Sequence, residues 1–170
     1  ICRDKSISLR SKLKLLRALV LSIFLYASET WTLTAELQRR IQALEMKCYR
    51  TVLGITYRDR VSNDDIRGLI TAHVDKYEDL LSIVKKKKLK WYGHVVRGNG
   101  LSKVILQGNV SGKRRRGAQR KLWTDNIKEW TGLGLNATQS VARDREKWRQ
   151  LVHKSSSRCP YDPGGLRDRK

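Results

Sequence analysis

The chain has 170 residues, of which 39% are hydrophobic and 31% charged, and its formal net charge is +21. This composition is typical of a folded protein rather than a disordered one, and the most apolar run, residues 18–27, is shorter than the roughly 20 residues of a membrane span. The three cysteines (Cys2, Cys48 and Cys159) are far apart, which argues against a zinc site or disulfide framework and favours a reducing, nuclear or cytoplasmic compartment.

Helical periodicity extends through nearly the whole chain, with no sustained alternation of the kind a strand would give, so the sequence predicts an all-α fold. The first helix is expected over residues 9–28, amphipathic at its start and fully buried over residues 18–27. Thr34 is a suitable N-cap for a second helix that stops at Gly54.

A short third helix is predicted after Ser62 or Asn63, either of which can cap it, and should run through Ile70. Asp64 and Asp65 fall in its first turn, where the helix dipole favours carboxylates. These two acids are therefore interpreted as structural.

The longest helix is predicted over residues 75–97, with lysines on one side and an apolar stripe on the other formed by Tyr77, Leu80, Leu81, Val84, Trp91 and Val95. Glycines then break the chain around residues 104–106, which are read as a brief helix or an extended strand. Residues 113–121 (KRRRGAQRK) lack apolar periodicity and are expected to form a loop or arm.

Two further helices are expected near the C-terminus. Trp123, Ile127 and Trp130 indicate a short one, and Asn136 can cap a last helix whose buried stripe is Val141, Trp148, Leu151 and Val152. Residues 155–170, which contain both prolines, are predicted to be a disordered tail.

The positive charge is concentrated in the middle of the chain. Residues 85–121 contain 13 Lys and Arg and no Asp or Glu, whereas residues 1–84 contain 14 against 10 and residues 122–170 contain 10 against 6. Self-repulsion opposes folding of such a segment unless a polyanion neutralises it. Nucleic acid is therefore the expected partner, with a solvated cationic face as the alternative.

The predicted contacts are phosphate contacts, with one possible base contact. Trp91 lies on the apolar stripe and is assigned to the core, so Tyr92 is the preferred residue for stacking on a base. The full predicted set is Lys85, Lys86, Lys87, Lys88, Lys90, Tyr92, Arg97, Lys113, Arg114, Arg115, Arg116, Arg120 and Lys121.

We identify no catalytic, metal or cofactor site in the sequence. His73, His94 and His153 are scattered, and no Cys or carboxylate stands at ligand spacing from them. The basic helix also lacks a free apolar face for lipid, so no membrane partner is expected.

Five phrases in fixed order resemble one protein family. They are LYASETWTL (25–33), KCYRTVLGITYRDRVSN (47–63), KLKWYGHVVR (88–97), GKRRRGAQRKLWTDNI (112–127) and ARDREKWRQLV (142–152). Together they are similar to the C-terminal part of endonuclease-reverse transcriptases encoded by non-LTR retrotransposons, downstream of the polymerase palm. The start at Ile1 and the single methionine, Met46, agree with the expectation of a fragment.

This resemblance implies a helical thumb that grips template and product, followed by a basic extension that holds RNA, DNA or a hybrid duplex. It assigns residues 1–60 to thumb-like helices, 61–111 to the long basic helix and a connector, 112–121 to a basic arm, 122–154 to C-terminal helices and 155–170 to the tail. The upstream polymerase domain would be a further partner. The family's catalytic Tyr-x-Asp-Asp turn is absent from this chain.

One departure from the family bears on specificity. Relatives carry an Arg-Gly-Arg-Pro core, whereas the matching positions here are Arg116, Gly117, Ala118 and Gln119. Loss of an arginine argues against insertion into a narrow minor groove and favours phosphate binding without sequence choice. The alternative from another class is a helical protein-interaction module whose basic segment is a nuclear-import signal.

Overall fold

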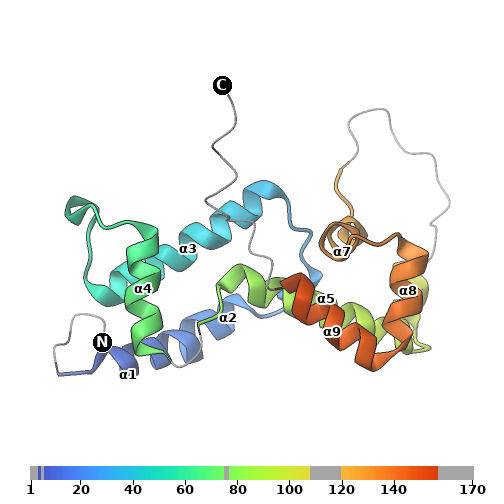
Figure 1. The fold of residues 1–170 in the computed structure, drawn as a ribbon, viewed down its shortest axis with the longest axis horizontal. Coiled ribbons are helices and arrows are strands. Elements are labelled where there is room, and N and C mark those ends of the chain that lie inside the picture. The colour runs from blue at the N-terminus through green and yellow to red at the C-terminus, as the bar shows by residue number, and fades with distance from the viewer. Residues whose placement is uncertain (1–3, 5, 75–76, 108–119, 157–170) are drawn as a thin grey trace. The chain divides into compact units, whose positions relative to one another are not determined.

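The computed structural model describes residues 4, 6–74, 77–107 and 120–156 (Figure 1). All the regular structure within these ranges is helical, so the predicted all-α fold is confirmed. The helices are α1 (Leu9–Leu15), a π-helical turn (Leu16–Leu21), α2 (Ser22–Phe24), α3 (Ala35–Leu53), α4 (Asn63–His73), α5 (Leu80–Arg97), α6 (Leu101–Gln107), α7 (Trp123–Thr131), α8 (Leu135–Arg143) and α9 (Arg145–Ser156), with short 3-10 turns at Ser28–Thr30 and Tyr57–Asp59.

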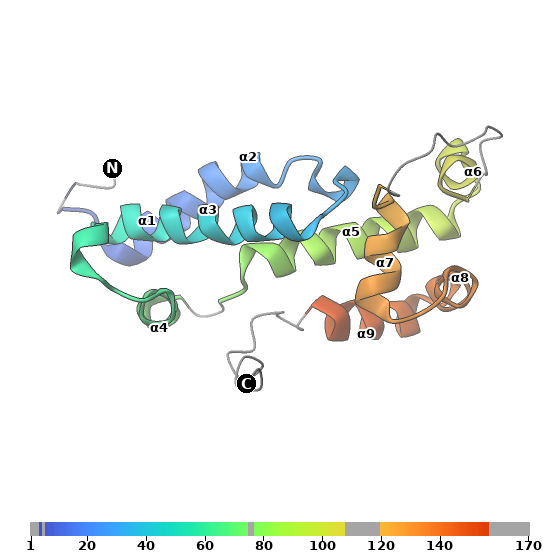
Figure 2. The same ribbon diagram turned by 90° about the horizontal axis from the view of Figure 1, so that it is seen from above.

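The chain divides into two units, which are described separately. The N-terminal unit comprises residues 1–28 and 33–84, and the C-terminal unit comprises residues 29–32 and 85–170. In the N-terminal unit α3 contacts both α1 and α4, and in the C-terminal unit α7, α8 and α9 contact one another (Figure 2). The boundary between the units falls within α5, after Val84.

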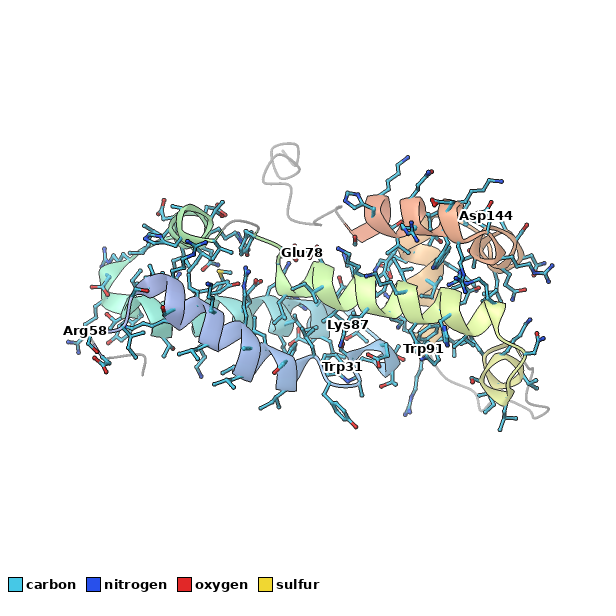
Figure 3. All side chains as sticks on the ribbon, turned by 90° about the horizontal axis from the view of Figure 1, so that it is seen from below. Trp31, Arg58, Glu78, Lys87, Trp91 and Asp144 are labelled. Carbon is cyan, nitrogen blue, oxygen red and sulfur yellow. The ribbon has the colours of Figure 1, made fainter. Side chains whose placement is uncertain are left out.

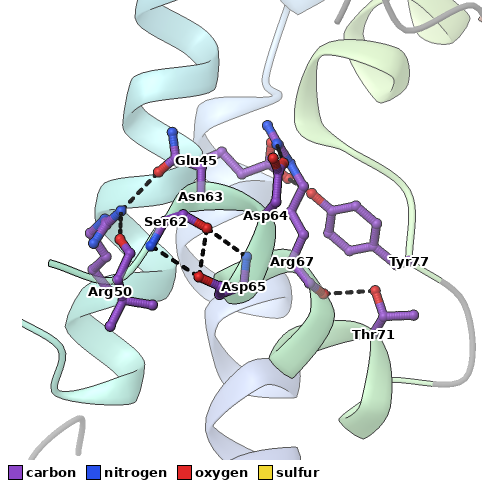
Figure 4. A network of polar contacts seen from close by, with 10 residues as sticks. Glu45, Arg50, Ser62, Asn63, Asp64, Asp65, Arg67, Thr71 and Tyr77 are labelled. Carbon is purple, nitrogen blue, oxygen red and sulfur yellow. Dashed lines mark hydrogen bonds and ion pairs between the residues drawn. The ribbon is translucent and has the colours of Figure 1, made fainter. Parts of the chain in front are cut away.

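Local chemistry fixes the ends of α3 and the start of α4 as predicted. The Thr34 hydroxyl accepts a hydrogen bond from the backbone N–H of Leu37 at 3.2 Å, and Gly54 ends the helix with a φ of 71°. Ser62 and Asp65 cap α4 reciprocally, since each side chain accepts from the other residue's backbone N–H (Figure 4). The helix continues beyond the predicted end to His73.

The first predicted helix was wrong in two respects. It is interrupted by the π-helical turn and ends at Phe24 rather than Ser28. Residues 18–27 are also not fully buried, because Leu19, Val20, Ile23 and Tyr26 are exposed, Ile23 by 77%. The π turn shifts the angular position of the residues that follow it, so a 3.6-residue period no longer predicts which of them face the core.

The C-terminal prediction also needs correction, because the single helix expected after Asn136 is two helices. Gly134, not Asn136, precedes α8, and Asp144 separates α8 from α9 in an extended conformation. The Asp144 carboxylate accepts hydrogen bonds from the backbone N–H groups of Glu146 and Lys147 at 3.0 and 3.2 Å, and so caps α9. Residues 113–119 and 157–170 lie outside the described residues.

A buried carboxylate in the N-terminal unit connects α3 to the start of α5. Glu45 is 1% exposed, and its Oε1 accepts hydrogen bonds from the backbone N–H of Leu80 at 3.1 Å and from the Tyr77 hydroxyl at 3.3 Å. Loss of solvation raises the pKa of Glu45 from 4.5 to about 7, against the opposing effect of the Leu80 hydrogen bond.

The raised pKa predicts how stability varies with pH. Because the folded state binds this proton more tightly than the unfolded state, Glu45 stabilises the fold fully below pH 4.5 and loses that contribution as pH rises to about 7. The loss should amount to about 3 kcal/mol. Urea unfolding at pH 4.5 and 7.5 should show this loss for the unaltered protein relative to Glu45→Gln, which keeps an acceptor without the charge. Parallel pH profiles of the two proteins would contradict the assignment.

Candidate nucleic-acid interface

The residues predicted to contact nucleic acid fall into different environments. Lys87, Lys90 and Arg120 are exposed, whereas Lys86, Arg97 and Lys121 are half-buried. Lys85, Lys88 and Tyr92 are buried. Lys113, Arg114, Arg115 and Arg116 lie outside the described residues.

Lys88 is part of the core of the C-terminal unit, which corrects its assignment as a phosphate contact. The residue is 0% exposed, and its ammonium donates hydrogen bonds to the carbonyl oxygen of Trp31 at 2.6 Å and to Asn126 Oδ1 at 2.8 Å. The same nitrogen lies 4.4 Å from the ring centroid of Trp123. Loss of solvation lowers the pKa of Lys88 to about 7, and the charge of Lys121 acts in the same direction.

The assignments of Lys85 and Tyr92 were also wrong. Lys85 is 4% exposed and its ammonium lies 5.7 Å from the ring centroid of Trp130. Tyr92 is 1% exposed and stacks on Trp123, so it is not available to a base. Burial of Lys85 and Lys88 agrees with the long apolar stem of the lysine side chain, which can pack against other apolar groups.

Trp91, which its spacing assigns to the core, keeps part of its surface accessible. It is half-buried, and its ring meets Trp123 edge-on with the centroids 5.3 Å apart. Lys87, one turn earlier, is exposed, and Figure 3 shows both side chains on α5. This pair keeps a cation and part of an aromatic ring accessible on one face of α5.

A second, larger basic surface is a cleft between α5 and α9, with a volume of about 500 Å³, which we call the basic cleft. Helix α5 contributes Lys86, Lys90, His94 and Arg97, and α9 contributes Arg145, Trp148, Arg149, Val152 and His153. No Asp or Glu is among these lining residues. The basic cleft therefore concentrates positive charge on one open, concave surface of the C-terminal unit.

Three contacts hold α5, α8 and α9 together around the basic cleft. The indole Nε1 of Trp148, which is 3% exposed, donates a hydrogen bond to the Leu89 carbonyl oxygen at 3.1 Å. Gly93 provides the space for that indole, because a Cβ at this position would overlap it. At the end of α5, Arg97 Nη1 donates to the carbonyl oxygen of Ala142 at 2.7 Å.

The ion pairs near the basic cleft are exposed and weak. Arg149 lies 3.5 Å from Glu146, and both side chains are more than 70% exposed, so solvent screens the attraction. Lys121, outside the cleft, pairs with Glu129, which is 52% exposed. Neither pairing prevents an arginine or lysine from turning toward a phosphate.

Four residues that line the basic cleft are not predicted as site residues from the sequence, namely His94, Arg145, Arg149 and His153. Arg145, Arg149 and His153 recur every four residues and so share one face of α9, which is the signal that periodicity offered. The periodicity of the sequence does not show that this face of α9 packs beside α5. No group of three or more His, Cys, Asp or Glu in the part of the chain that the structure describes is placed to hold a metal ion.

The described residues define an all-α protein with a strongly basic cleft. The chain is 28% identical over 155 residues to an uncharacterized transposon-derived protein of Caenorhabditis elegans, in an alignment that covers 86% of this chain and 55% of that protein. It therefore spans about half the length of this relative, and the similarity supports a transposon origin. No family model and no solved structure matches the chain. Among the described helices, none has the length and apolar character that crossing a membrane requires.

Proposed function

We propose that this chain is a non-catalytic nucleic-acid-binding segment from the C-terminal part of a retrotransposon-encoded reverse transcriptase. It holds template or product through phosphate contacts, beside an upstream polymerase domain, in the nucleus or cytoplasm. The observation that carries the proposal is the segment of residues 85–121, with 13 cations and no acid. The similarity to a transposon-derived protein and the sequence resemblance support the same reading.

The burial of two lysines changes which residues are proposed to contact phosphate, but most cations of residues 85–121 remain candidates. Lys85 and Lys88 serve the core, so the phosphate contacts fall to the accessible cations of α5, to the basic cleft and to the arm of residues 112–121. Lysine and arginine contacts to phosphate carry no sequence information. Binding is therefore expected to be strong at low salt and indifferent to base sequence.

Neutralising the arm tests the proposal. The triple variant Arg114→Ala, Arg115→Ala, Arg116→Ala should bind every sequence more weakly by a similar factor. The slope of log K against log salt should flatten by about three, because binding releases about one counterion fewer for each phosphate contact that is lost. The measurement is a filter-binding or fluorescence-anisotropy titration across salt concentrations.

A matched control removes the same charge elsewhere. The variant Arg39→Ala, Arg40→Ala, Arg58→Ala takes three exposed arginines from the N-terminal unit and should change the salt slope by less than about one. An unchanged slope in the arm variant would overturn the arm's role. Nuclear import that depends on the arm, in a chain that binds no nucleic acid, would instead support the protein-interaction alternative.

A further inference from the structure

Cationic and imidazole side chains line the basic cleft in two rows with the same repeat. On α5, Lys86, Lys90 and His94 follow one another every four residues, and on α9 Arg145, Arg149 and His153 do the same. Four residues advance an α-helix by about 6 Å. Each row therefore presents a positive or hydrogen-bonding group roughly every 6 Å along its helix.

This repeat fits an extended polyanion with one charge per unit. Consecutive phosphates of an extended nucleic-acid strand are separated by a distance close to the spacing of four residues along an α-helix. Proteins that bind single strands use positively charged grooves that follow the backbone. A histidine ring can donate an N–H to a phosphate oxygen, so His94 and His153 can extend rows that lysine and arginine begin.

The size and floor of the basic cleft select among nucleic acids. A volume of about 500 Å³ is that of a pocket for a small molecule, so the cleft accommodates a short length of the sugar–phosphate backbone of one strand and is too small for a duplex. Trp148 and Val152 form an apolar floor and are themselves buried. Because the Trp148 ring packs in the core, it is not available to stack on a base. The floor can therefore contact the sugar–phosphate backbone without recognising the base sequence.

We infer that the basic cleft is a track for a single strand of RNA or DNA, whose successive phosphates lie between the row on α5 and the row on α9. The inference rests on the proposed nucleic-acid binding and assigns it a substrate class, single strands in preference to duplexes. The cleft acts separately from the arm of residues 112–121, which contacts either kind of ligand.

The test compares two charge-matched variants of the full chain. The cleft variant is Lys90→Ala, Arg145→Ala, Arg149→Ala, and the control is Arg143→Ala, Lys147→Ala, Lys154→Ala, which removes three exposed cations from the same region outside the cleft. All six side chains are exposed, so both variants should retain the thermal unfolding midpoint of the unaltered protein. The probes are 12-nucleotide single strands of RNA and DNA and a 12-base-pair DNA duplex.

The cleft variant should bind both single strands at least tenfold more weakly, with a salt slope lower by about two, and should bind the duplex within threefold of the unaltered chain. The control should leave the ratio of single-strand to duplex affinity unchanged. Equal losses for strand and duplex, or equal losses in both variants, would overturn the track. Absence of binding to every probe at low salt would instead refute the proposed function, and the track with it.

Photocrosslinking gives a second readout that does not depend on any substitution. A single strand that carries 5-bromouracil should crosslink to peptides containing residues 86–97 or 145–153. Crosslinks confined to other peptides would place the strand elsewhere and contradict the inference.

Discussion

Replacement of Gly93 by alanine is expected to destabilise the C-terminal unit by about 2–3 kcal/mol and to deform the basic cleft. The new Cβ would overlap Nε1 of Trp148 and lie 2.5 Å from its Cδ1. Because the indole is buried and hydrogen-bonded to the Leu89 carbonyl oxygen, it can escape only by breaking that bond and moving the floor of the cleft. This cost exceeds the gain of up to about 1 kcal/mol that alanine brings to a helix interior.

Gly68 provides the matched control for this substitution. It also lies inside a helix, α4, but a Cβ there would meet nothing within 4 Å. Gly68→Ala should therefore stabilise the protein by about 0.5–1 kcal/mol through helix propensity alone. Urea unfolding of both variants measures the difference. A Gly93→Ala protein as stable as Gly68→Ala would show that Trp148 does not pack against Gly93 as described.

Lys88→Ala is expected to destabilise the protein by more than about 3 kcal/mol, an unusual result for a lysine. The substitution empties the space of a side chain that is 0% exposed, and it leaves the Trp31 carbonyl oxygen and Asn126 Oδ1 without their donor. Relief of the buried charge offsets part of this cost but does not fill the cavity.

The variant Lys87→Ala is the control that distinguishes a structural role of Lys88 from a role in nucleic-acid binding. Lys87 is exposed, so Lys87→Ala should change stability by less than about 0.5 kcal/mol. Chemical denaturation of the two variants, followed by nucleic-acid titration, distinguishes the possibilities. If Lys88→Ala kept full stability and lost affinity, Lys88 would be a phosphate contact, as the sequence pattern had suggested.

Helix ends were predictable because their chemistry is local. Thr34, Gly54 and Ser62 act on backbone groups within three or four residues of themselves. The sequence predicts Thr34 and Gly54 as helix ends, and Ser62 as one of two alternative caps beside Asn63. The boundary at Asp144 is local too, but Asn136 offered a competing cap and the apolar spacing continued across the break. Two helices were therefore read as one.

The core of the C-terminal unit could not be predicted in the same way. Lysine is almost never fully buried, so a run of four lysines predicts an exposed face. In the structure Lys88 is buried because three groups distant in sequence, Trp31, Trp123 and Asn126, surround its ammonium. Only the tertiary fold brings these groups together, and the same holds for the pairing of α5 with α9.

The candidate site was predictable in its charge but not in its shape. The acid-free segment of residues 85–121 stands out from composition alone, and Lys86, Lys90 and Arg97 do line the basic cleft. The other half of that cleft comes from α9, more than 45 residues later in the chain. There the cations alternate with acids along the sequence and leave no compositional signal.

The most direct test of nucleic-acid binding is a titration of the purified chain with single-stranded RNA, duplex DNA and an RNA–DNA hybrid at about 50 and 200 mM salt. Six phosphate contacts would make the affinity fall roughly a thousandfold between these two concentrations, whatever the base sequence. That result would support phosphate-mediated binding. Little binding at the lower concentration, or affinity that is insensitive to salt, would contradict it and favour a protein-interaction module.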